Sequence, residues 1–167
     1  MNKEILTEQA IYHGEITLPK GYEIDPSEMS QNILKSFYSN KKSIASKFLD
    51  QLNTYIRDNF ELRNNIKLIS KQIWGDIFSP NEKFTSLSTV DPVDLKNSPD
   101  FVCLYGINTL DCTLKIFYDD NRRKGRSWKI PLKQNTFVMF PATNAYTITN
   151  NQKSSLNFIQ TITYEYI

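Results

Sequence analysis

The spacing of the apolar residues changes at about residue 66, and this change constrains the fold more than any other feature of the chain. Before that point apolar side chains recur every three or four residues, which is the period of a helix with one buried face. After it, short apolar-rich runs alternate with clusters of turn-forming residues, as in a series of strands. Two helices followed by about eight short strands predict a β-sandwich or jelly roll with the helices packed outside.

Asp25 marks the start of the first predicted helix. It occupies the capping position, Pro26 takes the first helical position, and Glu28 follows three residues after the cap. The helix is predicted to run to about Tyr38. Its buried stripe is predicted to be Met29, Ile33 and Phe37.

The second helix is predicted over residues 44–60, where apolar side chains follow helical spacing. The polar side chains between them are expected to face solvent. The buried face is predicted to be Phe48, Leu49, Leu52, Tyr55, Ile56 and Phe60.

Strands are predicted wherever an apolar-rich run lies between turn clusters. One precedes the helices, at residues 11–18. The others are predicted at 67–70, 73–78, 101–106, 112–118, 127–131, 136–140, 146–148 and 156–164. We see no repeat or linker, so the prediction is a single domain over residues 1–167, helical at about 25–60 and β at about 66–167.

The composition excludes several classes of function. A net charge of +2 over 167 residues argues against a nucleic-acid binder. No run approaches the roughly 18 apolar residues of a membrane span, so we expect no membrane segment. The start of the sequence lacks the apolar region of a secretory signal, so we expect none.

The chain has one histidine, His13, and two cysteines. One imidazole excludes a 2-His-1-carboxylate iron site within a single chain. We predict that His13 is a surface or hydrogen-bonded structural residue, with a lone titrating base as the alternative. If residues 107 and 108 form a two-residue hairpin turn, Cys103 and Cys112 lie opposite each other and could form a disulfide or hold a soft metal. The simpler interpretation is two small core residues.

The densest run of charge lies at residues 119–129, between two predicted strands. Its cations, with the aromatic ring that follows them, are suited to holding a phosphate or carboxylate group and stacking on a planar ligand. Alternatively, Asp119 and Asp120 neutralise the cations and the loop is simply solvated. The candidate ligand-binding residues here are Arg122, Arg123, Lys124, Arg126 and Trp128.

Two further stretches carry predictions. Residues 161–167 alternate apolar and polar side chains, which predicts a half-exposed strand at a sheet edge that pairs with another subunit. Asp91, Asp94 and Asp100 are predicted to be turn and cap residues, because a calcium loop needs denser oxygen ligands and a glycine.

The second half of the chain resembles 2-oxoglutarate/Fe(II) oxygenases, most of all the small type found in marine T4-like phages. The resemblance covers roughly residues 66–164 and rests on Trp74 and on residues 98–102, 116–120, 128–132 and 137–141. Its sharpest part is the Phe-Val-Met-Phe-Pro run at 137–141, which is similar to the family's strand leading to the distal metal ligand. The resemblance implies a double-stranded β-helix.

The departures from the family pattern concern the metal site. The family's H-x-D/E motif corresponds to residues 84–91, which contain no histidine. The position implied for the distal histidine is Tyr146, which we add to the candidate ligand-binding residues. The cation nearest the position implied for the 2-oxoglutarate anchor is Lys153. We therefore predict no metal ligand, no cofactor and no catalytic residue.

Three hypotheses follow. The first is a non-catalytic, degenerate oxygenase-like protein of bacteriophage origin. It would act as a structural or interaction module in the host cytoplasm or the virion, with another copy of the chain or phage structural proteins as partner. The second is a module that binds a small anionic ligand through the loop at 122–128 and Tyr146. The third is a 2-oxoglutarate-dependent Fe(II) oxygenase with an unusual site.

Overall fold

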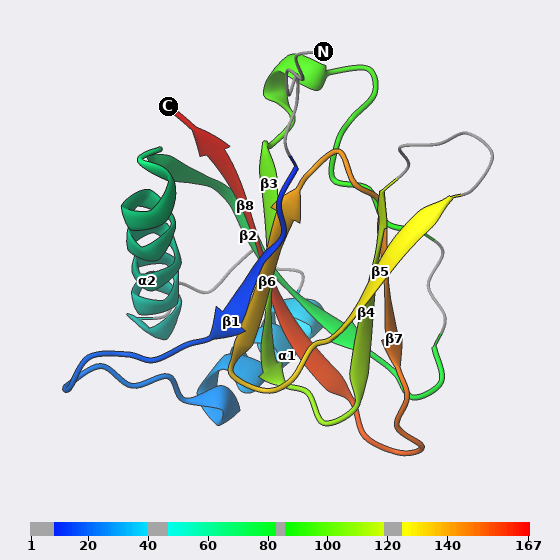
Figure 1. The fold of residues 1–167 in the computed structure, drawn as a ribbon. Coiled ribbons are helices and arrows are strands. Elements are labelled where there is room, and N and C mark those ends of the chain that lie inside the picture. Colours follow the sequence, from blue (N-terminus) through cyan, green and yellow to red (C-terminus); the bar gives the residue numbers. More distant parts are fainter. Residues whose placement is uncertain (1–8, 40–46, 83–85, 119–124) are drawn as a thin grey trace, which may run out of the picture.

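The computed structural model describes residues 9–39, 47–82, 86–118 and 125–167, and their elements form three layers (Figure 1). A five-stranded sheet lies in the middle, with strand order β1-β6-β3-β8-β2. Its strands are β1 (Tyr12–Glu15), β2 (Leu68–Phe78), β3 (Phe101–Asn108), β6 (Thr136–Pro141) and β8 (Asn157–Tyr166). A three-stranded sheet covers one face, in the order β5-β4-β7. Its strands are β4 (Cys112–Tyr118), β5 (Arg126–Pro131) and β7 (Tyr146–Asn150).

The two predicted helices cover the other face of the large sheet. The first, α1 (Pro26–Ser39), begins at the predicted cap: a carboxylate oxygen of Asp25 accepts the backbone N–H groups of Ser27 at 2.8 Å and Glu28 at 3.2 Å. Its predicted buried stripe is wrong at one position, because Phe37 is 71% exposed. The buried residues of α1 end at Ile33, so its last turn lies beyond the apolar surface of the sheet.

The second helix, α2 (Lys47–Asn64), has the predicted buried face. Its predicted first residues, 44–46, lie outside the described part of the chain, and the helix continues four residues past Phe60. The side chains that pack against the sheet are Phe48, Leu49, Leu52, Tyr55, Ile56 and Phe60. Helical spacing was therefore sufficient to find this contact surface.

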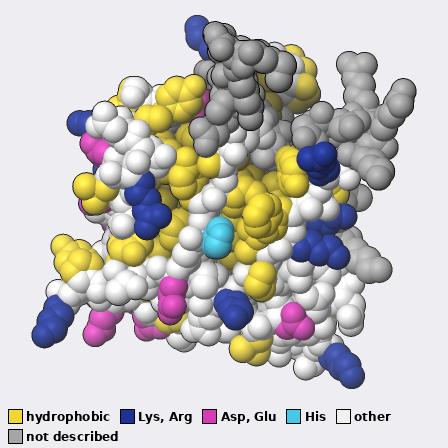
Figure 2. All heavy atoms as spheres, in the orientation of Figure 1, with side chains coloured by type: hydrophobic (Ala, Val, Ile, Leu, Met, Phe, Trp, Pro, Cys, Tyr) yellow, Lys and Arg dark blue, Asp and Glu magenta, His cyan; other side chains and the backbone are white. Residues whose placement is uncertain are grey.

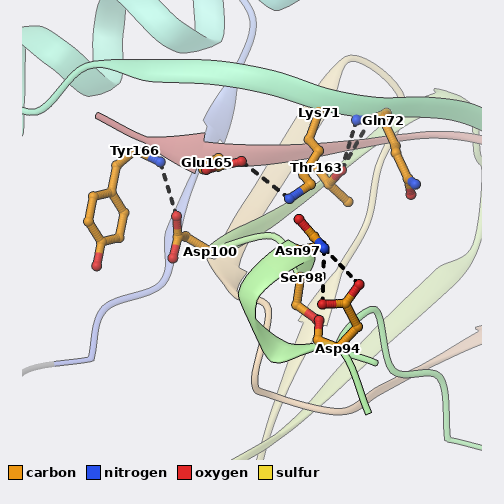
Figure 3. Close-up of polar contacts among 9 residues, drawn as sticks. All are labelled: Lys71, Gln72, Asp94, Asn97, Ser98, Asp100, Thr163, Glu165 and Tyr166. Carbon is orange, nitrogen blue, oxygen red and sulfur yellow. Dashed lines mark hydrogen bonds and ion pairs between the residues drawn. The ribbon is translucent and has the colours of Figure 1, made fainter. Parts of the chain in front are cut away.

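Most predicted strands agree with the structure to within two residues at each end. The clearest difference is β2, which is one strand where two were predicted. Its pairing with β8 shifts between Ser70 and Gln72, leaving Lys71 as a bulge. Lys71 forms an ion pair of 3.2 Å with Glu165, and the N–H of Gln72 donates to the hydroxyl of Thr163 at 3.0 Å (Figure 3).

The chain changes sheet at nearly every turn after β3. It passes from β3 to β4, returns at β6, crosses again at β7 and comes back at β8, while β4 and β5 form a hairpin within the small sheet. This winding confirms the predicted fold class: a mainly β, α+β protein with a double-stranded β-helix and two flanking helices.

The two-residue hairpin that would have set the cysteines opposite each other does not form. Cys103 and Cys112 lie in different sheets, because β3 already pairs with β6 on one edge and β8 on the other. Cys103 faces the helices and Cys112 faces the space between the sheets. Both are free thiols in the core, as in the simpler interpretation.

The predicted exposed edge at the C terminus is also wrong. β8 lies between β3 and β2, and its residues Asn157 to Tyr164 are buried. The threonines that suggested a solvent-facing side lie inside, where the Thr161 hydroxyl donates to Asp76 at 2.9 Å. Hydrogen bonding allows these polar side chains to be buried.

Asp91 and Asp94, in the connection between β2 and β3, are confirmed as turn residues, whereas Asp100 bonds the distant end of β8; Figure 3 shows Asp94 and Asp100 with their partners. Asp91 accepts the N–H of Val93 at 2.8 Å, and Asp94 accepts the Asn97 amide at 3.0 and 2.8 Å beside a single 3-10 turn, Leu95–Asn97. Asp100 accepts the N–H of Tyr166 at 3.0 Å, which fixes this connection to the end of β8. None of the described helices is long and apolar enough to cross a membrane.

Gly75 of β2 sets how closely α1 approaches the sheet, since a methyl group there would overlap the side chain of Ile33. We expect Gly75→Ala to destabilise the fold by about 1–3 kcal/mol, or to lower Tm by roughly 2–12 °C. Thermal unfolding measures this. Gly125→Ala is the matched control, because nothing lies within 4 Å of its added carbon. Ile33→Ala makes room for the added methyl group, so Gly75→Ala should cost less stability in that background than in the natural chain. An equal loss of stability in both backgrounds would contradict the contact.

Candidate functional site

Tyr146 and Trp128 lie at the same level of the three-stranded sheet. Both pair with Ile116 of β4, one from β7 and the other from β5. Paired residues share a face of a sheet, so both side chains are on the face turned toward the large sheet, about 10 Å apart at their backbones. Tyr146 is 3% exposed, whereas Trp128 on the edge strand is 54% exposed. The structure thus separates these two candidates into a buried and an open environment.

Of the other candidate residues, Arg126 lies on the same strand as Trp128. Arg126 begins β5, pairs with Tyr118, and lies on the same face of the strand as Trp128. It is exposed to solvent. Arg122, Arg123 and Lys124 lie outside the described residues. Arg126 and Trp128 are therefore together, and Tyr146 is not with them.

Among the described residues, Asp76 is the carboxyl group whose charge acts on Tyr146. Tyr146 packs edge-on against Phe140, with ring centroids 5.2 Å apart. Asp76 lies on the edge strand β2, which contacts β7, and it accepts the hydroxyl hydrogen of Thr161. We name Asp76, Tyr146 and Thr161 the interior cluster.

Burial makes the charged forms of this cluster unfavourable. Burial raises the pKa of Asp76 above its ordinary value of 3.8, although hydrogen bonds from Thr161 and Trp74 act in the opposite direction. Burial also raises the pKa of Tyr146, and the neighbouring charge of Asp76 adds to that shift. The phenol of Tyr146 is therefore protonated at neutral pH.

The stretch that the resemblance aligns with the H-x-D/E motif lies beside Tyr146. Leu87 and Tyr146 form an isolated antiparallel bridge, with backbone N···O distances of 2.7 and 3.0 Å. Phe84 and Thr85 of this stretch lie outside the described residues. The fold therefore brings together the two segments expected to carry ligands, with leucine and tyrosine at the point of contact.

The residues present do not fit a ferrous ion in a facial site. His13, the one imidazole of the sequence, is on β1 and Asp76 is on β2, at opposite edges of the large sheet. Four strand spacings separate them, roughly 19 Å along the sheet. The described residues contain no group of three or more His, Cys, Asp or Glu side chains able to hold a metal. Fe(II) of this class needs two imidazoles and a carboxylate within about 2 Å of one point.

Asp76 was not among the residues that the sequence predicted for a site. The available signal was its position in a strand, two residues after Trp74 and two before Phe78, which places it on the inner face. A carboxyl group at such a position must be hydrogen-bonded or protonated.

No family model matches this chain, and no curated protein matches it. Solved structures do. A prolyl-4-hydroxylase from Pseudomonas putida has TM-score 0.66 and 10% identity, over 94% of this chain and 88% of that one. The alpha-ketoglutarate-dependent non-heme epimerase SnoN of nogalamycin biosynthesis has TM-score 0.64 and 10% identity, over 93% and 77%. HygX from Streptomyces hygroscopicus, with nickel and 2-oxoglutarate bound, has TM-score 0.60 and 6% identity, over 94% and 83%.

The chain therefore has the fold of the 2-oxoglutarate/Fe(II)-dependent oxygenases. At this level of identity the similarity establishes the fold, and the activities belong to the named proteins. Fold alone does not fix activity, so the function has to be argued from the side chains above.

The raised pKa of Asp76 gives the interior cluster a measurable pH dependence. The folded chain holds this proton more tightly than the unfolded chain does. The free energy of unfolding therefore falls as pH rises from about 4 through the folded pKa. We expect Asp76→Asn, which keeps an acceptor for Thr161, to gain stability relative to the natural chain over this range. Urea unfolding between pH 4 and 8 measures the difference.

Asp58→Asn, on the exposed side of α2, is the control and should show no such gain. A difference between Asp76→Asn and the natural chain that does not vary with pH would contradict the assignment.

Proposed function

We propose that this protein is non-catalytic and uses the oxygenase fold as a binding module. The observation that carries the proposal is the separation of the chain's one imidazole from the interior cluster. His13 lies on the edge strand β1, and the position implied for the distal ligand is Tyr146. No second nitrogen ligand of this kind exists in the sequence.

The chemistry of Tyr146 and Asp76 supports this proposal. A metal ligand has to be deprotonated, and burial favours the protonated form of both groups. A raised pKa makes the deprotonated form of each group harder to reach, which weakens metal binding. Two oxygen ligands of this kind are also a poor set for Fe(II), which favours imidazole in such sites.

Association with a partner is the finer part of the first hypothesis, and it stays a prediction. The C-terminal strand does not supply the contact, because β8 is interior to its sheet. Phage origin, a second copy or a phage structural protein as partner, and a location in the host cytoplasm or virion likewise stay predictions. A binding function requires none of them.

The second candidate function is a 2-oxoglutarate-dependent Fe(II) oxygenase with an unusual site. Two observations favour it: the fold shared with such enzymes, and the placement of one carboxyl group, Asp76, beside Tyr146. Under this alternative, Asp76 would be indispensable for metal binding.

An anaerobic titration with Fe(II) and 2-oxoglutarate distinguishes the two. We expect 2-oxoglutarate to bind no more tightly with Fe(II) than without it, and no succinate to form in air above the level without protein. Calorimetry and succinate analysis measure these, with the Pseudomonas putida prolyl-4-hydroxylase as the positive control. Iron-dependent binding or succinate formation that disappears in Asp76→Asn would establish the second candidate and overturn the first.

A further inference from the structure

An apolar hollow of about 290 Å³ lies between the edges of the two sheets, on the side away from the interior cluster. Its lining includes Ile11, His13, Tyr118, Trp128, Ile130 and Pro141. Figure 2 shows the histidine near the centre of this face, with hydrophobic side chains next to it and basic side chains farther out. No function described above uses this hollow.

The strand register explains why these side chains converge. Trp128 and Ile130 pair with Ile116 and Leu114, which belong to the core between the sheets, so both point toward the large sheet. His13 pairs with Val138 of the same core and points toward the small sheet. Because β1 and β5 are edge strands, none of the described strands covers the space between them.

The size and lining of the hollow indicate a class of ligand. A cavity of about 150 Å³ in another protein holds benzene, so 290 Å³ has room for roughly two rings. Trp128 and Tyr118 offer aromatic faces for stacking, and His13 offers a ring N–H as a hydrogen-bond donor. The described residues of the lining include no Asp or Glu, and Arg126 lies on the same face of β5, two residues before Trp128.

We propose that this hollow binds a planar aromatic carboxylate of one or two rings, stacked on Trp128 with its carboxylate toward His13. The inference rests on the proposed function, because it names the ligand class of the binding module. Stacking supplies the contact area. The ring N–H of His13 and the nearby guanidinium of Arg126, in a described lining without carboxylates, favour a negative charge.

The test uses 2-naphthoate as the probe and 2-naphthalenemethanol as its uncharged analogue. The chain has two tryptophans, so a nitrogen-15 correlation spectrum shows two indole N–H peaks. We expect 2-naphthoate to shift the peak that is missing in Trp128→Ala, and that variant to raise Kd about tenfold. His13→Gln should weaken binding of the carboxylate and leave binding of the alcohol unchanged.

Tyr38→Ala is the matched control, because Tyr38 is an aromatic side chain 83% exposed on α1, outside the lining. It should bind 2-naphthoate as the natural chain does. No shift at the Trp128 peak, or an unchanged Kd in Trp128→Ala, would overturn the proposal. Equal affinity for the alcohol and the carboxylate would overturn its choice of an anion.

These measurements contain neither iron nor 2-oxoglutarate, so their failure is distinct from failure of the proposed function. Succinate formation would contradict the non-catalytic assignment and leave the 2-naphthoate result unchanged. Absence of 2-naphthoate binding would overturn the proposed ligand class. It would not affect the argument that the chain lacks the imidazole ligands for iron.

Discussion

The fold depends on a central pair of strands, β3 and β8, that are buried over most of their length on both faces. Each uses both edges for pairing within the sheet, and the apolar faces of the pair must be covered from outside. The helices cover one face and the three-stranded sheet covers the other. The space between the sheets is therefore closed along its middle, and it can present polar groups only near its two sides.

Those two sides differ in chemistry. On the side of β2 and β7, burial raises the pKa of both Asp76 and Tyr146. On the side of β1 and β5, Trp128 and His13 face an open apolar hollow. A metal bound on the side of β2 and β7 would need ionised oxygen ligands or neutral imidazoles there. The side of β1 and β5 instead offers an aromatic surface for stacking and a hydrogen-bond donor for a soluble ligand.

The sequence was sufficient for features set by local chemistry. The cap at Asp25 and the buried face of α2 depend on residues close in sequence, and both are as predicted. Sheet membership depends on pairing between distant segments, so the sequence could not decide whether Cys103 and Cys112 lie on one hairpin or, as the structure has them, in different sheets. The prediction of a half-exposed edge strand at residues 161–167 was wrong for a similar reason. Alternation of apolar and polar residues does not distinguish a threonine hydroxyl that faces solvent from one that is bonded to Asp76. The hollow could not be predicted from the sequence, because its lining includes residues from four strands, β1, β4, β5 and β6, that are distant along the chain.

The position of His13 finally bears on what a single imidazole does in this fold. At the edge strand β1 it is separated from Asp76 by the whole width of the large sheet, so no side-chain rearrangement brings the two to one ion. It lines the hollow together with Trp128, where its ring N–H is a hydrogen-bond donor suited to an anion. His13 is too far from Asp76 to share a metal ion with it, but it lies where it can donate a hydrogen bond to a ligand in the hollow. The proposal of a binding function rests on the position of His13 as well as on its being the one imidazole of the sequence.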